Sequence, residues 1–240
     1  MNTSDTRRRM LNDCMTVWLT MFLAGMVLLL PAAHADEAAP FPVYKPPNRG
    51  APVVRVSGGT RGKGDNLPSI YVLTPEHMGL TSKAQPVLFW YVSQPLPVRF
   101  DFVLISEGGN EPLVETRLKD VESAGIHRIS LGDYNVTLEP GVSYQWSVAL
   151  ESDTEARSGD VFASGEIERI DPPAGIKKRF EIVSGEELVT QYASTGLWYD
   201  ALQELSEQIE ADPGNTRLQQ VRAALLRQVG LDEVAAYVAR

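Results

Sequence analysis

The glycine-rich segment Gly58–Gly64 is the first part of the chain whose residue types suggest a chemical site. Gly59 and Gly64 have the spacing of a phosphate-binding loop, in which backbone amides surround the phosphate. That loop also requires Lys followed by Ser or Thr, whereas Asp65 and Asn66 come next here. We therefore predict a flexible arm rather than a nucleotide site, with basic side chains available to an anionic partner: Arg49, Arg55, Arg61 and Lys63.

Histidine, the most frequent general base, occurs downstream of residue 35 only as His77 and His127. Either could activate a serine, but His127 lies in an alternating strand pattern and His77 in a polar turn. We therefore expect structural or solvated roles for both. The chain also lacks the short motifs of serine hydrolases, zinc peptidases, EF-hands and dinucleotide-binding folds. The sequence thus predicts no catalytic, cofactor-binding or metal-binding residues.

Carboxylates are numerous, and two pairs have a spacing that permits chemistry. Glu166 and Glu168 share one face of a predicted strand, and Glu186 and Glu187 stand at a predicted helix start. Two carboxylates at a suitable separation hydrolyse glycosidic bonds. Helix capping and solubility explain the same residues, and we prefer that interpretation.

The aromatic run Phe89-Trp90-Tyr91 is the strongest surface candidate. Adjacent strand residues point to opposite faces, so Phe89 and Tyr91 share one face and Trp90 takes the other. An exposed Trp90 or Tyr91 would provide a flat surface on which a sugar ring stacks. We expect instead that at least two of the three rings lie in the core.

The first 35 residues have the pattern of a secretory signal peptide. A basic region, Arg7–Arg9, precedes an uncharged run from Met15 to Leu30, and Ala33 and Ala35 form an A-x-A cleavage site. The mature chain is therefore predicted to begin at Asp36, in the periplasm or outside the cell. Both the general secretory and the twin-arginine routes fit these arginines, and an uncleaved membrane anchor is a less favoured alternative.

Composition narrows the possible partners. Among 240 residues, 31 are acidic and 22 basic, and a net charge of -9 opposes the attraction to phosphate that dominates nucleic-acid binding. The single cysteine, Cys14, lies within the predicted signal peptide and excludes an intramolecular disulfide. Stability of the exported protein must then come from packing, for which 43 % hydrophobic residues suffice.

The rest of the chain divides into three predicted parts. Residues 36–69 are rich in proline and glycine and predict an extended arm. Residues 70–172 contain short alternating runs separated by turns, which predicts an antiparallel β-sandwich of the immunoglobulin or fibronectin type. Tyr144, six residues after Leu138, has the position of a tyrosine corner in such folds. The predicted strands are 69–73, 86–93, 98–106, 112–118, 125–131, 142–152 and 161–170.

Residues 173–240 change to helical spacing. Ser184 and Glu187 predict a capping box for a short helix that ends near Ser194. Residues 196–211 and 216–229 then resemble a single tetratricopeptide hairpin, and a last short helix follows. Repeats of this kind need several copies to bury their apolar faces. We therefore expect the hairpin to dock on the sandwich rather than on a partner.

Several segments, in their order along the chain, together carry a family resemblance: 44–52, 58–62, 79–81, 85–86 with 89–91, 144–146, 165–169, 196–201 and 229–231. They resemble a bacterial family known as domain of unknown function 928 (DUF928). The resemblance implies an exported bacterial protein with no assigned activity and no established catalytic residues. It also implies that the arm and the turn at residues 196–201 belong to a shared architecture.

These observations together favour a non-enzymatic interaction or scaffold module of the cell envelope, with a protein partner. Two alternatives remain open: an envelope protein that binds or hydrolyses glycan, and an accessory partner of an envelope sensor. Exposure of Trp90 or Tyr91 beside carboxylates would favour the glycan alternative.

Overall fold

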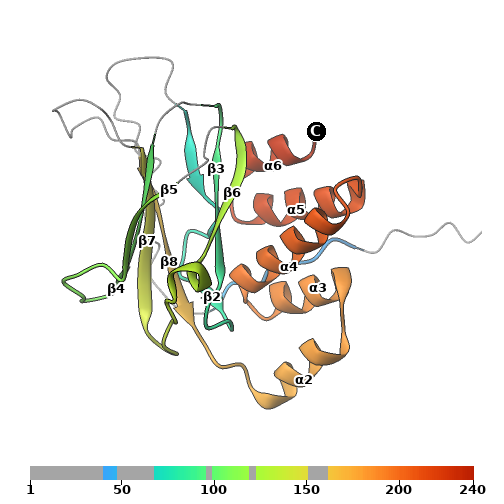
Figure 1. Cartoon of the computed structure of the whole chain (residues 1–240). Helices are drawn as coiled ribbons and strands as arrows, with labels where there is room; N and C mark the ends of the chain where they lie inside the picture. Colours follow the sequence, from blue (N-terminus) through green and yellow to red (C-terminus); the bar gives the residue numbers. More distant parts are fainter. Residues whose placement is uncertain (1–39, 48–67, 96–98, 119–122, 151–161) are drawn as a thin grey trace, which may run out of the picture. The chain divides into compact units, whose positions relative to one another are not determined.

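Two β-sheets and a group of helices form the part of the chain that the structure describes (Figure 1). The computed structural model describes residues 40–47, 68–95, 99–118, 123–150 and 162–240. Residues 41–240 belong to one compact unit. Among the described residues, none of the helices is sufficiently long and apolar to cross a bilayer.

The smaller sheet has the strand order β1-β3-β6 and is antiparallel throughout. All side chains of β3 except the first are buried, because the sheet lies between the larger sheet and the helices (Figure 1). This arrangement explains why β3 is apolar on both faces rather than alternating. The strands are β1 (Ile70–Val72), β3 (Val87–Val92) and β6 (Gly125–Ser130).

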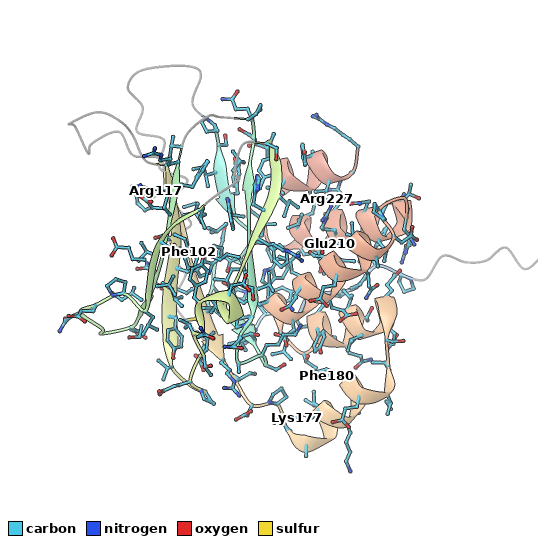
Figure 2. The ribbon with its side chains drawn as sticks, in the orientation of Figure 1. Phe102, Arg117, Lys177, Phe180, Glu210 and Arg227 are labelled. Carbon is cyan, nitrogen blue, oxygen red and sulfur yellow. The ribbon has the colours of Figure 1, made fainter. Side chains whose placement is uncertain are left out.

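The larger sheet has the order β2-β8-β7-β4-β5, and two of its strands, β4 and β7, alternate between buried and more exposed positions. Phe102 and Trp146 are fully buried, and Phe102 lies among the densely packed side chains beside this sheet (Figure 2). The strands are β2 (Gly79–Thr81), β4 (Phe100–Ser106), β5 (Val114–Leu118), β7 (Ser143–Leu150) and β8 (Phe162–Arg169), and a short 3-10 helix, η1 (Leu131–Tyr134), follows β6.

The helices follow β8; α4, α5 and α6 lie beside the smaller sheet, whereas α2 packs against α3 away from it (Figure 1). α4 carries the longest buried face and contacts β2 and β3, so the helical segment docks within the chain as expected. The helices are α2 (Ala174–Ile182), α3 (Gly185–Ser194), α4 (Trp198–Ala211), α5 (Thr216–Gln228) and α6 (Asp232–Val238).

The structure confirms a mostly β chain with an α-helical C-terminus, but it corrects three details. β2 was not predicted, and it pairs in parallel with β8, so the larger sheet is mixed rather than antiparallel. α2 was also not predicted, because it follows two prolines and buries no residue. Ser184 is the N-cap of α3, but its side chain makes no capping hydrogen bond, so the predicted capping box is absent.

Candidate functional site

A groove of about 900 Å³ lies between β6 and helices α4, α5 and α6. Phe89 and Ile126 form its wall on the sheet side, and Ile209 and Val238 contribute apolar surface on the helix side. Three consecutive residues of β6, 126–128, line the groove. Since alternate side chains of a strand point to opposite faces, the backbone edge of β6 must also reach it.

The charged side chains that line this groove are mostly positive. Three arginines, Arg128, Arg222 and Arg240, line it together with one carboxylate, Glu210. Arg128 donates two hydrogen bonds from Nη1 to Glu210, at 2.9 and 2.8 Å, and so connects β6 with the end of α4. Glu210 lies on the helical side of the unit (Figure 2). Both side chains are more than half exposed, so this ion pair stabilises the fold only weakly.

Arg222 has a different environment from Arg128. Its Nη2 donates a hydrogen bond to Oε1 of Gln219 at 2.6 Å, while its Nε is buried and has no partner among the described residues. No carboxylate pairs with it in the described part of the chain. Burial lowers the pKa of Arg222, and the nearby Tyr237 opposes this effect. An anionic group in the groove would therefore supply a partner that the fold itself does not provide.

β6 forms one edge of the smaller sheet. The amide of Leu131, just after β6, donates to the carbonyl of Pro86, just before β3. Together with the strand register, this hydrogen bond shows which residues of β6 direct their backbone groups toward β3. In an antiparallel pair this direction alternates, so Ile129 and His127 also face β3, while Ile126, Arg128 and Ser130 face outward. None of these three outward residues has a backbone hydrogen bond to another described segment. The groove thus contains an unpaired strand edge.

The aromatic run is buried, as expected from the sequence. Phe89, Trp90 and Tyr91 are each no more than 3 % exposed. Tyr91 faces the helices and contacts Tyr237, with ring centroids 5.0 Å apart, while Trp90 stacks on His127 at 5.6 Å. Trp90 and Tyr91 therefore form no exposed platform for a sugar ring.

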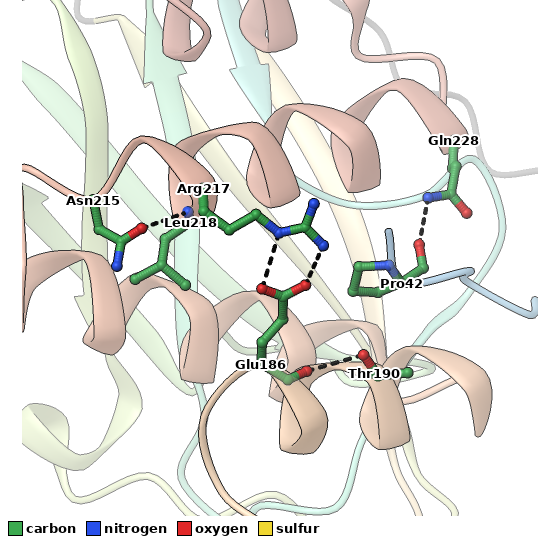
Figure 3. Close-up of polar contacts among 7 residues, drawn as sticks. All are labelled: Pro42, Glu186, Thr190, Asn215, Arg217, Leu218 and Gln228. Carbon is green, nitrogen blue, oxygen red and sulfur yellow. Dashed lines mark hydrogen bonds and ion pairs between the residues drawn. The ribbon is translucent and has the colours of Figure 1, made fainter. Parts of the chain in front are cut away.

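The segment 41–47, at the start of the predicted arm, lies against the helices. The backbone amide of Lys45 donates to the carbonyl of Ala193 at 3.0 Å. Gln228, at the end of α5, accepts a hydrogen bond from the amide of Tyr44 at 2.9 Å. It also donates one to the carbonyl of Pro42 at 2.9 Å (Figure 3). This segment is therefore engaged by the chain itself.

Side chains strengthen the same contact. The ring of Tyr44 packs edge-on against Trp198, with centroids 5.0 Å apart. The guanidinium of Arg217 lies 4.5 Å above the ring of Phe41 and pairs with Glu186, which also joins α3 to α5 (Figure 3). Segment 41–47 consequently covers the junction of these helices.

The turn at residues 196–201 fixes α4 against both sheets. The indole of Trp198 donates to the carbonyl of Leu73 at 2.8 Å. The hydroxyl of Tyr199 accepts a hydrogen bond from the indole of Trp146 at 2.9 Å and lies 2.9 Å from the carbonyl of Glu166. Burial raises the pKa of Tyr199, so the hydroxyl stays protonated and can donate. These residues have an architectural role.

Asp200, the next residue, is fully buried. Its carboxylate accepts hydrogen bonds from the backbone amide of Ser82, at 3.0 and 3.2 Å, and from the Ser82 hydroxyl. Burial raises the pKa of Asp200, although these bonds oppose the rise. The carboxylate thus holds the turn after β2.

The remaining sequence candidates do not meet in one site. His77 contacts the carbonyl of Met78 and stacks on Tyr44, and His127 contacts the carbonyl of Ser123, so both take structural positions. Glu166 lines a separate pocket of about 300 Å³ with Glu107. Burial, and to a smaller extent the charge of Glu107, raises the pKa of Glu166. Residues outside the described part include Ala33, Ala35, Asp36, Gly58–Gly64 and the basic residues Arg49, Arg55, Arg61 and Lys63.

Sequence reasoning singled out Phe89 and His127, which line the groove, but missed its arginines. Arg222 occupies a polar position of α5 and was not distinguished from other surface arginines. The only available signal was the lack of an acidic residue three or four positions away, which leaves Arg222 without a helical ion pair. Among the described residues, no group of three or more His, Cys, Asp or Glu side chains is arranged to hold a metal ion.

Comparison with known proteins identifies the chain at the level of a family. The family model described as Domain of Unknown Function (DUF928) matches residues 56–238. The protein belongs to the DUF928 family. No curated protein matches this DUF928 member significantly. Among solved structures it is similar to an engineered protein from the Northeast Structural Genomics Consortium, with 8 % identity and a TM-score of 0.29. The match covers 44 % of this chain and 21 % of that one, and it carries no functional inference.

Proposed function

We propose that this DUF928 protein is an exported, non-catalytic interaction module of the bacterial cell envelope. The observation that carries the proposal is the groove beside β6. It combines an apolar wall, the partly buried Arg222 and an unpaired strand edge. Surfaces with these properties bind other molecules through main-chain pairing, charge complementarity and apolar burial.

Export is a separate part of the proposal, supported by the signal pattern of residues 1–35. Mass spectrometry of the protein purified from its source bacterium should give an N-terminus at Asp36. Recovery of the intact N-terminus from the cytoplasmic fraction would contradict export. Substitution of both Ala33 and Ala35 by Glu should block cleavage, because the peptidase requires small residues there.

We also infer that the two sheets form a variant of the immunoglobulin-like sandwich and that α4 and α5 form a tetratricopeptide-like hairpin. The hydrogen bond from the amide of Glu139 to the hydroxyl of Tyr144, 2.9 Å long, supports the first inference because tyrosine corners contain it. Asn215 caps α5 through the amide of Leu218 and, with the turn at Pro213-Gly214, supports the hairpin.

The glycan alternative has less support than the interaction module, because Trp90 and Tyr91 are buried. Accessory binding to an envelope sensor is one form of the proposed interaction, and the same experiment addresses it. A photoreactive amino acid at Thr216, an exposed residue that lines the groove, should cross-link a partner in living cells.

The matched control is the same photoreactive amino acid at Glu115, an exposed position on β5 in the other sheet. We expect adducts from Thr216 and none from Glu115. Equal adducts from both positions, or no adduct from Thr216 in cells that export the protein, would contradict the proposed function.

A further inference from the structure

We propose that the groove binds an extended peptide segment of a partner protein, which pairs with the edge of β6 and places a carboxylate against Arg222. This inference rests on the proposed interaction function and specifies the chemistry of the partner. The other occupants of such a groove, a glycan or a lipid, become outcomes of the test.

The edge of β6 favours a peptide because it offers both donors and acceptors in a repeating pattern. Ile126 and Arg128 direct their backbone N–H and C=O groups outward, and the next outward residue is Ser130. An extended peptide carries the complementary groups at the same spacing, whereas a sugar or an acyl chain does not. A fourth strand would thus extend the smaller sheet beside the helices.

Charge complementarity identifies the side chain that the peptide brings. Among the described residues, Arg222 has a hydrogen bond only to the neutral amide of Gln219, and its buried Nε has no partner there. A carboxylate accepts two parallel hydrogen bonds from a guanidinium, which satisfies both its charge and its donors. Arg240 lines the same groove and adds positive charge. Asp or Glu is therefore expected at the peptide position that faces α5.

The walls of the groove explain how alternate peptide positions are accommodated. Ile209 and Val238, on the helix side, offer apolar contacts to side chains that flank the acidic one. The ion pair between Arg128 and Glu210 spans β6 and α4, but it is solvent-exposed and rearranges at little cost when a segment enters. The expected motif is thus an acidic residue between apolar or β-branched ones.

Peptide libraries test this chemistry directly. Fluorescently labelled hexapeptide libraries of Val, Ile and Thr with a fixed central Asp are compared by anisotropy with libraries carrying Asn at that position. We expect the Asp library to bind at least tenfold more tightly to the full mature protein. R222Q should remove this preference, and R227Q, an exposed arginine on the same helix outside the groove, should retain it.

A second measurement examines strand pairing without altering the protein. N-methylation of the peptide amides that face β6 should abolish binding, while methylation of the alternate amides should preserve it. Equal binding of Asp and Asn libraries, no binding of either, or insensitivity to R222Q would overturn the proposal. A partner cross-linked at Thr216 that is captured equally by R222Q would leave the interaction function intact and refute this recognition. A glycan or lipid adduct at Thr216 would also overturn it.

Discussion

The hydroxyl of Tyr199 connects α4 to the larger sheet, and its removal is the sharpest test of the architecture. Y199F retains the ring and creates no cavity, but it removes the acceptor of the Trp146 indole N–H. Trp146 is fully buried, so no water replaces the lost partner. An unsatisfied buried donor costs about 1–3 kcal/mol, and Y199F should lower the free energy of unfolding by this amount.

Urea denaturation of the mature protein measures this change. With an m value of about 2 kcal/mol/M, the midpoint should fall by about 0.5–1.5 M without a change in m. Y134F is the matched control, because Tyr134 is 37 % exposed and has no hydrogen bond through its hydroxyl in the described structure. Its midpoint should stay within about 0.25 M of the wild type, equivalent to about 0.5 kcal/mol.

A double-mutant cycle separates the hydrogen bond from general effects on packing. W146F removes the donor at the cost of a smaller ring, so Y199F in that background no longer leaves an unpaired N–H. The double variant should be more stable than the sum of the single changes implies, by about 1 kcal/mol or more. Additive changes, or a Y199F protein within about 0.5 kcal/mol of the wild type, would refute the role assigned to this hydroxyl.

Three further predictions concern the same architecture. Because burial raises the pKa of Asp200 above its ordinary 3.8, the contribution of this residue to stability is greatest below pH 3.8 and is lost as the pH rises through the folded-state pKa. Urea midpoints measured from pH 3 to 7 should therefore fall less steeply for D200N than for the wild type, and parallel curves would contradict this. G79A should lower the free energy of unfolding in urea by about 1–3 kcal/mol, because the added methyl group would lie 2.5 Å from the ring of Tyr199. G175A, where nothing lies within 4 Å of the added methyl group, should not destabilise the protein, and equal stabilities of the two variants would disprove the close contact. Q228A should speed hydrogen exchange of the Tyr44 amide by at least tenfold, and unchanged protection would show that segment 41–47 is held in another way.

Local patterns in the sequence are sufficient for much of the fold. The alternation of Tyr144, Trp146, Val148 and Leu150 predicts one buried face of β7, and the structure buries all four. The three- and four-residue spacing of apolar residues in α4 likewise predicts its buried face. These elements could be predicted because each pattern lies within a single strand or helix.

The elements that were missed depend on distant partners or on sequence context. β2 has only three residues, and its pairing with β8 joins segments almost 90 positions apart, so no local periodicity predicts this strand. α2 buries no residue and follows Pro172-Pro173, which is a signal for a loop. The candidate groove could not be predicted for the same reason. In the sequence Arg222 is an ordinary polar residue of α5, and only the packing of distant segments places it in a groove with β6.

The sequence alone determines an acidic chain with an export signal pattern, a strand-rich middle and a helical end, because composition and periodicity are local properties. It also determines membership of a family whose function is unassigned. Only the tertiary structure decides that the aromatic run is buried and that residues 196–201 join α4 to both sheets. It also decides that Arg222, which has no carboxylate partner among the described residues, lines the same groove as β6. The physical reason is that burial, unpaired charge and strand pairing are properties of residues far apart in the chain, which acquire them only when the sheets and helices pack together.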